Sequence, residues 1–385
     1  MTNNNDKKVL NVPHLRFPEF TEEWVNVSLK DVADFQKERI SSGLLDESTY
    51  ISTENILQNF QGVQSAISIP ANTNVVAYKK NDILLSNIRP YLKKVWFSDR
   101  IGGCSADVFV LRSKTCEPEF LYNVIASDKF INYVMSGAKG VKMPRGDKNQ
   151  MESFSFSIPA VVEQRKISRL FQLLDERIVT QNKIIEDLKK LKSAIVDKLY
   201  SSTNGETYSF RQLFEVVNEK NKARAYKNVL SASQELGMIE RSDINIDIKF
   251  EQESISGYKI VRKGDYVVHL RSFQGGFAFS DRTGICSPAY IILRPNDLVA
   301  YGYLSHFFTS KPFIKSLKLV TYGIRDGRSI NVDEWLDMPI LLPPAQEQIR
   351  ILTIVNTIDA KLHNEVKVQF CLSSQKSYLL NTMFI

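Results

Sequence analysis

The sequence has few cysteines and no long hydrophobic run. Only four of its 385 residues are cysteines (Cys104, Cys116, Cys286 and Cys371), and no two of them form a CxxC pair. Neither a zinc site nor a disulfide framework is therefore indicated. No apolar stretch is long enough to span a bilayer, and the N-terminus lacks the apolar core of a signal peptide. We expect a cytoplasmic protein with reduced thiols and no membrane segment.

Motifs of nucleotide-dependent and metal-dependent enzymes are missing as well. There is no GxxxxGK[ST] loop, no HExxH, no Asn-Pro-Pro-Tyr or Asp-Pro-Pro-Tyr, and no glycine-rich cofactor loop after a strand. The four histidines are scattered, and no Ser/His/Asp or Cys/His set can be assembled by spacing. Asp247-Ile248-Lys249 resembles a nuclease carboxylate–lysine pair, but such tripeptides are common. The sequence predicts a chain that is not an enzyme and that carries neither a cofactor nor a metal of its own.

Two long segments with heptad periodicity dominate what the chain does contain. Their seam positions are spaced alternately four and three residues apart, which is typical of a coiled coil. The first seam is Ile167, Phe171, Leu174, Ile178, Ile185, Leu188, Ile195 and Leu199, interrupted by Gln181 and Lys192. The second is Ile351, Val355, Ile358, Leu362, Leu372, Leu379 and Met383, interrupted by Glu365, Gln369 and Lys376. We expect two helices of roughly 40 residues, each about 60 Å long. The alternative is two ordinary amphipathic helices, each lying on its own domain.

The chain is a tandem repeat of one unit, with an offset of about 182 to 184 residues between the copies. The segment from Ser98 to Ser105 recurs from Ser280 to Ser287, and the Pro-x-x-x-Glu-Gln motif beginning at Pro159 recurs at Pro343. A compact domain usually has its ends close together, so the second domain returns the chain most easily between antiparallel helices. We predict an α+β fold: a pseudo-twofold tandem repeat of two globular domains separated by two long antiparallel coiled-coil helices. The expected boundaries are 1–157 for the first domain, 158–200 for the central helix, 201–341 for the second domain and 342–385 for the C-terminal helix.

Matched loops of the two halves place cations beside aromatic and small residues. The net charge of +7 is compatible with an acidic partner, but the position of the charges matters more. Cations pair with phosphates, Arg forks onto guanine and Gln forks onto adenine. The alternative is that these loops are solvated hairpin turns. The candidates in the first half are Arg89, Tyr91, Lys93, Lys94, Lys139, Lys142 and Arg145, and those in the second half are Arg271, Gln274, Arg325 and Arg328.

Several of these segments together resemble the specificity subunit of bacterial type I restriction–modification systems. They are Val12–Phe20, Asn87–Lys94 with its Gly-x-Cys-Ser sequel, and the two Glu-Gln motifs that open the long helices. The resemblance covers essentially the whole chain. It implies two target recognition domains, each reading one half of a split, asymmetric sequence in double-stranded DNA. The helix pair would set the spacing between the halves.

The same resemblance also implies protein partners. Two methyltransferase subunits would dock on the helix pair and bind S-adenosylmethionine, and restriction/translocase subunits would add to that core. The candidate DNA contacts carry over only to matching loops, so base-reading and phosphate roles stay unassigned. The competing hypothesis is a two-domain scaffold whose helices assemble other proteins without touching DNA.

Overall fold

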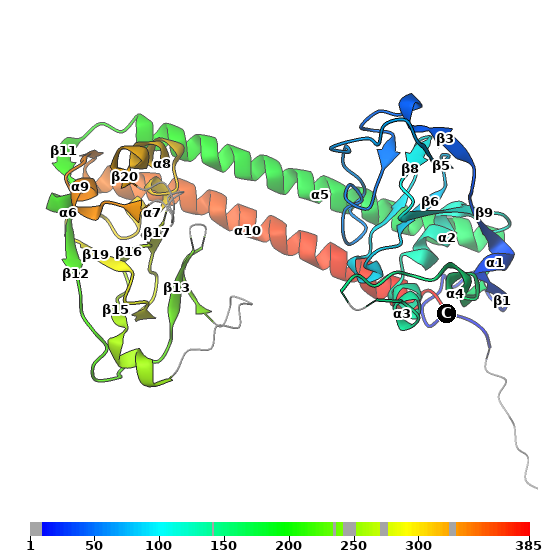
Figure 1. Cartoon of the computed structure of the whole chain (residues 1–385). Coiled ribbons are helices and arrows are strands. Elements are labelled where there is room, and N and C mark those ends of the chain that lie inside the picture. The colour runs from blue at the N-terminus through cyan, green and yellow to red at the C-terminus, as the bar shows by residue number, and fades with distance from the viewer. Residues whose placement is uncertain (1–9, 141, 234–235, 242–251, 270–275, 323–328) are drawn as a thin grey trace, which may run out of the picture. The chain divides into compact units, whose positions relative to one another are not determined.

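The computed structural model describes residues 10–140, 142–233, 236–241, 252–269, 276–322 and 329–385 (Figure 1). Arg271, Gln274, Arg325, Arg328 and the 247–249 tripeptide lie outside these ranges. The chain forms two compact units. Unit 1 comprises Met1–Asn182 and Lys367–Ile385, and unit 2 comprises Lys183–Val366. Each unit therefore contains one globular domain together with part of each long helix.

In unit 1, two four-stranded sheets form the body of the globular domain. The first has the order β2 (Ala33–Phe35), β9 (Val108–Ser113), β6 (Ile83–Ser86) and β7 (Val95–Phe97). The second has the order β3 (Arg39–Ser41), β5 (Asn74–Tyr78), β8 (Gly102–Cys104) and β4 (Tyr50–Ile51). At the base, β1 (Val25–Ser28) pairs antiparallel with β10 (Ser155–Ile158), so the two ends of the domain meet. The helical elements are α1 (Leu29–Val32), η1 (Ser42–Leu44), η2 (Pro90–Leu92), α2 (Pro118–Ile125), α3 (Asp128–Ser136) and α4 (Lys148–Glu152).

Unit 2 repeats this plan. Its four-stranded sheet has the order β12 (Phe214–Val217), β19 (Ile291–Pro295), β16 (Tyr266–Val268) and β17 (Phe277–Phe279), and β11 (Glu206–Ser209) closes the domain against β22 (Pro339–Leu342). In the described part of the unit, three further two-stranded pairs are β13 (Leu230–Ser233) with β14 (Gly237–Glu240), β15 (Lys259–Val261) with β18 (Gly284–Cys286), and β20 (Thr321–Tyr322) with β21 (Ser329–Ile330). The helical elements are α6 (Phe210–Leu213), η4 (Gln252–Gly257), α7 (Tyr303–Phe307), α8 (Lys311–Ser316), η5 (Leu317–Val320) and α9 (Val332–Leu336). The tandem α+β repeat is confirmed.

A buried aspartate holds the central sheet of each unit in the same way. Asp82 accepts two hydrogen bonds from the Arg112 guanidinium, at 2.8 and 2.7 Å, and a third from the Lys79 amide. In unit 2, Asp265 makes the corresponding bidentate pair with Arg294, at 2.9 Å for both bonds. Each carboxylate is nearly fully buried, and removing one partner of such a buried pair is strongly destabilising. Both copies of the sequence repeat therefore contain the same buried Asp–Arg ion pair.

The Glu-Gln motif joins each long helix to its globular domain. Gln164, in the first turn of α5 (Val161–Ser201), donates to the Pro159 carbonyl and accepts from the Glu117 amide. Gln348, in the first turn of α10 (Ala345–Thr382), donates to the Pro343 and Leu298 carbonyls and accepts from the Ala300 amide. Both glutamines are buried, and in each the side-chain nitrogen donates a hydrogen bond and the side-chain oxygen accepts one. The repeated motif is thus a polar clamp that fixes the direction in which each helix leaves its domain.

The core of unit 1 includes the end of α10 and the residues that follow it. Phe384 packs against Phe120 and Phe171, with ring centroids 5.2 and 5.7 Å apart. The N-terminal segment lies against the same region, because the Leu15 amide donates to the Thr382 carbonyl. In unit 2, the Phe210 ring stacks on Trp335 at 4.4 Å and the Tyr200 hydroxyl of α5 donates to the Tyr303 carbonyl. Each core is therefore built from a globular domain and from helix residues distant in sequence. In the described part of the chain, no helix is long and apolar enough to cross a membrane.

Candidate nucleic-acid interface

Two loops that the sequence suggested separately form one surface in unit 1. The Arg89 amide donates to the Pro144 carbonyl at 2.8 Å, and the Gly146 amide donates to the Asn87 carbonyl at 3.1 Å. An isolated antiparallel bridge joins Ile88 to Arg145. The segments 87–94 and 137–148 are therefore fixed to each other by backbone hydrogen bonds. We call this surface the unit 1 reading surface.

Three of the candidate contact residues on this surface point into solvent. Arg89, Tyr91 and Lys142 are exposed, and their side chains form no hydrogen bond or ion pair with any described residue. Arg89 also holds a left-handed backbone conformation at φ 52°, as does Lys93. Residues other than glycine adopt this conformation only where their surroundings impose it, and such positions cluster at binding sites. The loop thus presents the Arg89 guanidinium and the Tyr91 ring to solvent from a constrained backbone.

The other four candidates have partners within unit 1. Lys93 pairs with Asp128, at the start of α3, and Lys94 donates to the Thr53 carbonyl at 2.5 Å. Lys139 pairs with Asp147 at 3.2 Å, and Arg145 with Asp107 at 2.6 Å. The Lys139 and Arg145 side chains remain more than half exposed, so both can still reach a phosphate. The Lys93 and Lys94 side chains are only partly exposed, and the sequence gave no means to foresee the partners that hold them.

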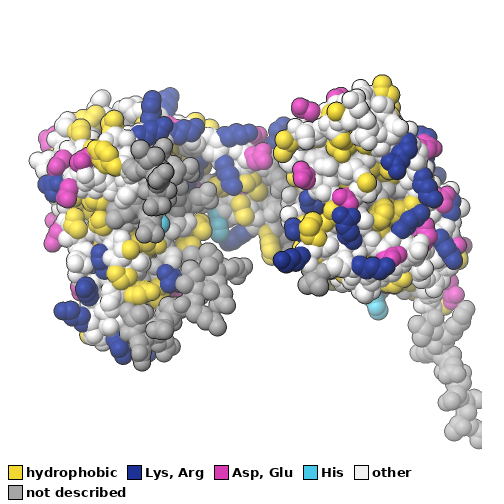
Figure 2. Space-filling model, in the orientation of Figure 1, with side chains coloured by type: hydrophobic (Ala, Val, Ile, Leu, Met, Phe, Trp, Pro, Cys, Tyr) yellow, Lys and Arg dark blue, Asp and Glu magenta, His cyan; other side chains and the backbone are white. Residues whose placement is uncertain are grey.

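The four candidate residues of unit 2 lie outside the described ranges, but the residues on both sides of them are described. The His269 amide donates to the Gly276 carbonyl at 2.6 Å, on either side of the segment that contains Arg271 and Gln274. Similarly, β20 and β21 pair on either side of the segment that contains Arg325 and Arg328. The roles of these four residues remain predictions. On the face shown in Figure 2, Lys and Arg side chains are spread over both units among neutral and apolar groups.

The predicted seam residues lie on the sheltered side of both long helices. None is classed as exposed, and Ile167, Phe171, Ile351 and Val355 are fully buried. Within unit 1, α5 and α10 run antiparallel, since Phe171 meets Phe384 and Asp175 meets Lys376 further along. The helices therefore pack through the face that the heptad pattern identified.

One lysine of each seam forms an ion pair with an aspartate of the other helix. In unit 1, Lys376 of α10 donates to Asp175 of α5 at 2.5 Å. In unit 2, Lys192 of α5 lies 2.5 Å from Asp359 of α10. Asp175 and Asp359 occupy the same position of the repeat, as do the two lysines. Each helix thus contributes the lysine to one pair and the aspartate to the other, which fixes the register of two antiparallel copies of one segment.

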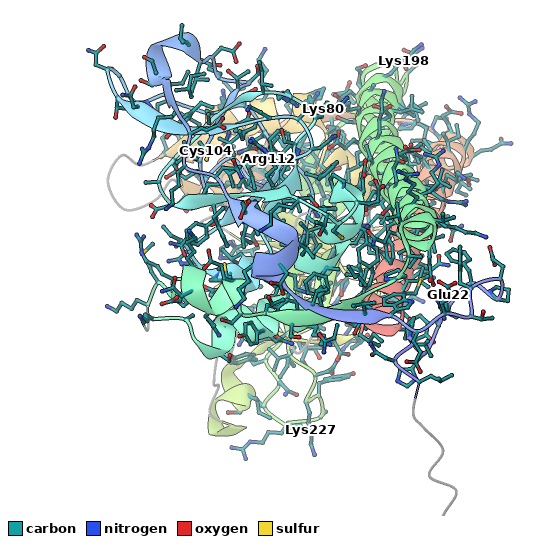
Figure 3. The ribbon with its side chains drawn as sticks, turned by 90° about the vertical axis from the view of Figure 1, so that its right-hand side faces the viewer. Glu22, Lys80, Cys104, Arg112, Lys198 and Lys227 are labelled. Carbon is teal, nitrogen blue, oxygen red and sulfur yellow. The ribbon has the colours of Figure 1, made fainter. Side chains whose placement is uncertain are left out.

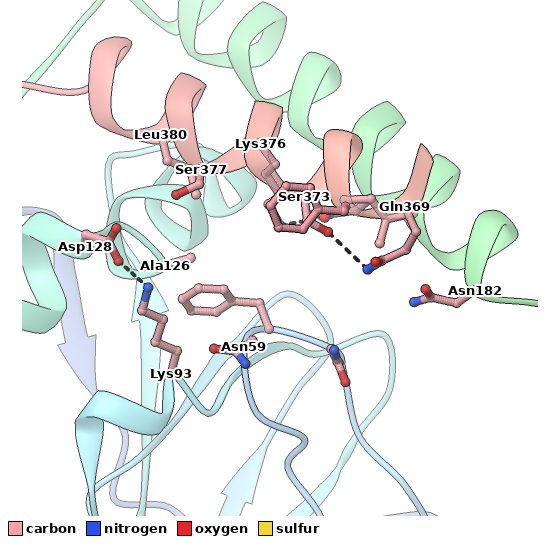
Figure 4. A pocket seen from close by; sticks show the side chains of 15 residues that line it. Asn59, Lys93, Ala126, Asp128, Asn182, Gln369, Ser373, Lys376, Ser377 and Leu380 are labelled. Atoms are coloured by element: carbon pink, nitrogen blue, oxygen red, sulfur yellow. Dashed lines mark hydrogen bonds and ion pairs between the residues drawn. The ribbon is translucent and has the colours of Figure 1, made fainter. Parts of the chain in front are cut away.

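A cavity of about 360 Å³ lies between the unit 1 reading surface and the helix pair of that unit (Figure 4). Asn59 and Phe60 line it and donate their amides to the Leu92 and Lys93 carbonyls, at 3.1 and 3.2 Å. Both residues have positive φ, so this support is itself a constrained turn. Across the cavity, the Lys376 ammonium is 5.9 Å from the centre of the Phe60 ring. The loop that carries Arg89 and Tyr91 therefore rests on a second loop, which in turn contacts α10.

Comparison with known families agrees with this repeat. The family model of the type I restriction modification DNA specificity domain matches residues 21–190 and again residues 205–369. The chain belongs to this family. The two matches fall on the two copies of the repeat, and together they include both reading loops of unit 1, most of α5 and the larger part of α10.

Individual relatives of this specificity-domain family are similar over part or all of the chain. The MjaVIII specificity subunit of a type I restriction enzyme from Methanocaldococcus jannaschii is 27% identical over 203 residues, which is 51% of this chain and 46% of that protein. The chain thus spans less than half the length of that curated relative. The S subunit of a type I restriction–modification system from M. genitalium has a TM-score of 0.57 at 14% identity, covering 97% of this chain and 99% of that chain. A chain from a structural study of type I R-M system assembly and conformational transition has a TM-score of 0.61 at 16% identity, covering 93% of this chain and 96% of that chain. These two structures share its fold.

Proposed function

We propose that this chain is the DNA-sequence-recognition subunit of a type I restriction–modification complex. Each unit reads one half of a bipartite, asymmetric target, and the paired helices hold the two readers at a set spacing. The observation that carries the proposal is the family match to both copies of a reading domain joined to the same helix pair. Two different half-sites require two domains that share a framework but differ in their loops.

The helix pair also offers surface for protein partners. On the unit 1 part, Val179 and Tyr378 are exposed although they are large and apolar, and on the unit 2 part Leu191 and Ile349 are likewise exposed. Apolar groups on the outer face of an already paired helix favour a further protein interface. We assign these faces to two methyltransferase subunits, with restriction/translocase subunits joining that core.

In this assignment the chain itself performs no chemistry. The methyltransferase partners would bind S-adenosylmethionine and transfer its methyl group to target adenines, and this chain would determine which adenines are reached. The seam ion pairs and the glutamine clamps then have a positional role. They hold each reading domain at a fixed angle and distance from the helices on which a partner docks.

The test is co-expression of the chain with its methyltransferase partner, followed by mapping of methylated adenines across a genome. We expect one bipartite sequence with a constant spacer. A matched variant carries one extra heptad in each long helix, inserted after Asn182 and after Val366. It should methylate the same two half-sites at a longer spacing, because seven helical residues add roughly 10 Å.

Two results would count against the proposal. If the complex methylates no defined sequence and its DNA affinity does not fall with added salt, the chain is a scaffold that does not contact DNA. If the heptad variant reads the original spacing, the helices do not set the distance between half-sites.

A further inference from the structure

A basic loop in unit 2, which contains none of the residues suggested by the sequence, has the properties of a DNA contact. It follows the edge strand β12 and contains four cations and no acidic residue: Lys220, Lys222, Arg224 and Lys227. The side chains of Lys222, Arg224 and Lys227 are exposed and form no hydrogen bond or ion pair with any described residue. Figure 3 shows Lys227 extending away from the body of the unit. The nearest acidic residue in sequence, Glu219, is already paired with Arg262 at 3.0 Å.

The backbone of this loop is held by a buried asparagine. The Asn221 side chain donates to the Tyr226 carbonyl at 2.8 Å and accepts from the Tyr226 amide at 3.2 Å. Its own amide donates to the Tyr258 carbonyl, and its carbonyl accepts from the Arg224 amide, both at 2.9 Å. Asn221 is 1% exposed. The buried Asn221, at the start of the loop, therefore holds the loop through its side chain at Tyr226 and through its backbone at Tyr258 and Arg224.

Apolar packing and backbone conformation add to this order. Tyr226 and Tyr258 pack on a small buried cluster that contains Val229, Ile255 and Ile285. Arg224 holds a left-handed conformation at φ 51°, which a residue with a side chain adopts only when its surroundings impose it. The cations are thus displayed from a preformed backbone, so binding a ligand does not require the loop to be ordered first.

The corresponding segment of unit 1 begins at Lys37 and also has two cations, Lys37 and Arg39, on either side of the acidic Glu38. From Ile40 to Tyr78 it has no Lys or Arg, whereas Asp46, Glu47 and Glu54 are present. There, the buried Asn55 instead joins the Tyr50 and Gln64 carbonyls. The unit 1 segment therefore carries charges of both signs, whereas the loop 220–227 carries positive charges alone.

We propose that the loop 220–227 is a phosphate-contacting element, through which unit 2 binds the DNA backbone independently of base sequence. The ligand class follows from the chemistry: three long cations that have no partner among the described residues, on an ordered backbone, match a row of phosphates. The inference rests on the proposed function. It adds that unit 2 contacts the DNA backbone through a loop without acidic residues, whereas the matching stretch of unit 1 carries charges of both signs.

The experiment measures DNA affinity of the assembled complex as a function of salt. In the loop variant, Lys222→Gln, Arg224→Asn and Lys227→Gln remove three charges, and Asn tolerates the left-handed conformation at position 224. The matched control is Lys30→Gln, Lys80→Gln and Lys129→Gln in unit 1, which changes net charge equally at three exposed lysines whose ammonium groups bond to no described residue. A second variant keeps the charges as Lys222→Arg, Arg224→Lys and Lys227→Arg.

Each phosphate contact contributes about 0.9 to the slope of log affinity against log salt concentration. The loop variant should flatten this slope by about 2 to 3, on target and random DNA alike, while the methylated sequence stays the same. The control should change the slope by less than about 1, and the charge-keeping variant should match the wild type.

An unchanged slope in the loop variant, or an equal change in the control, would overturn the proposal. A wild-type complex with no salt-dependent affinity would instead overturn the proposed function itself.

Discussion

The two copies of the Glu-Gln motif allow a test of how burial changes the strength of one ion pair. In unit 1, Glu163 accepts two hydrogen bonds from the Arg16 guanidinium, both at 2.7 Å, and its side chain is 1% exposed. In unit 2, the corresponding Glu347 is 39% exposed and pairs with Arg350 only three residues further along the helix. The substitutions Arg16→Ala and Arg350→Ala therefore remove the same kind of partner in two different surroundings.

The Arg16→Ala variant leaves a carboxylate buried without its cation. Such a loss costs about 3–5 kcal/mol, and the position of Glu163 in the first turn of α5 recovers up to about 1 kcal/mol through the helix dipole. A net loss of about 3 kcal/mol raises the fraction of opened molecules roughly 150-fold. We expect amide hydrogen exchange in the first turns of α5 to accelerate by about two orders of magnitude. Arg350→Ala should change exchange at the start of α10 less than about fivefold, because solvent screens that pair.

A rescue variant separates charge from packing. Replacing both partners, as Arg16→Met with Glu163→Met, should recover most of the protection, since apolar groups can substitute for a buried pair at little cost. Equal and small effects of Arg16→Ala and Arg350→Ala would refute the reasoning, because burial would then not distinguish the two copies. Failure of the double replacement to recover protection would indicate that the N-terminal segment is held by contacts other than this pair.

Two further predictions concern the helix pair. Asp175→Lys or Lys376→Asp should each destabilise unit 1 by about 1–2 kcal/mol in thermal unfolding, since the pair is only partly buried, and the two together should restore at least half of that loss. Additive losses would contradict the pairing. In unit 2, burial lowers the pKa of His306, as does the nearby Lys192, whereas the hydrogen bond that the His306 ring makes to the Asn356 side-chain oxygen and the charge of Asp359 act in the opposite direction. The unfolded chain then binds more protons than the folded one, so unit 2 should lose stability as pH falls below about 6.5. His306→Gln should flatten this dependence, and an unchanged pH profile in that variant would assign it to another group.

The helix-pair seam shows where heptad spacing in the sequence is sufficient to predict the buried face of a helix and where it is not. Heptad spacing identified the paired face along most of both helices, because that face is fixed by the 3.6-residue turn and by nothing more distant. Near the end of α5, however, Val196 is 3% exposed and Ile195 is more accessible. Likewise Leu380, which is not in the predicted seam, is buried near the end of α10. At these ends the helices pack on a globular domain as well as on each other, and the buried stripe turns accordingly.

The sequence by itself determined the repeat, the two long helices and their polar seam positions, because each is written in the spacing of residues along one stretch of chain. Only the tertiary structure decided which cations are free. Lys93 pairs with Asp128, 35 residues away. The basic loop around Arg224 owes its order to Asn221 and to the carbonyl of Tyr258. The availability of a charged side chain depends on what the fold brings within a few ångströms of it, and local spacing carries no record of that.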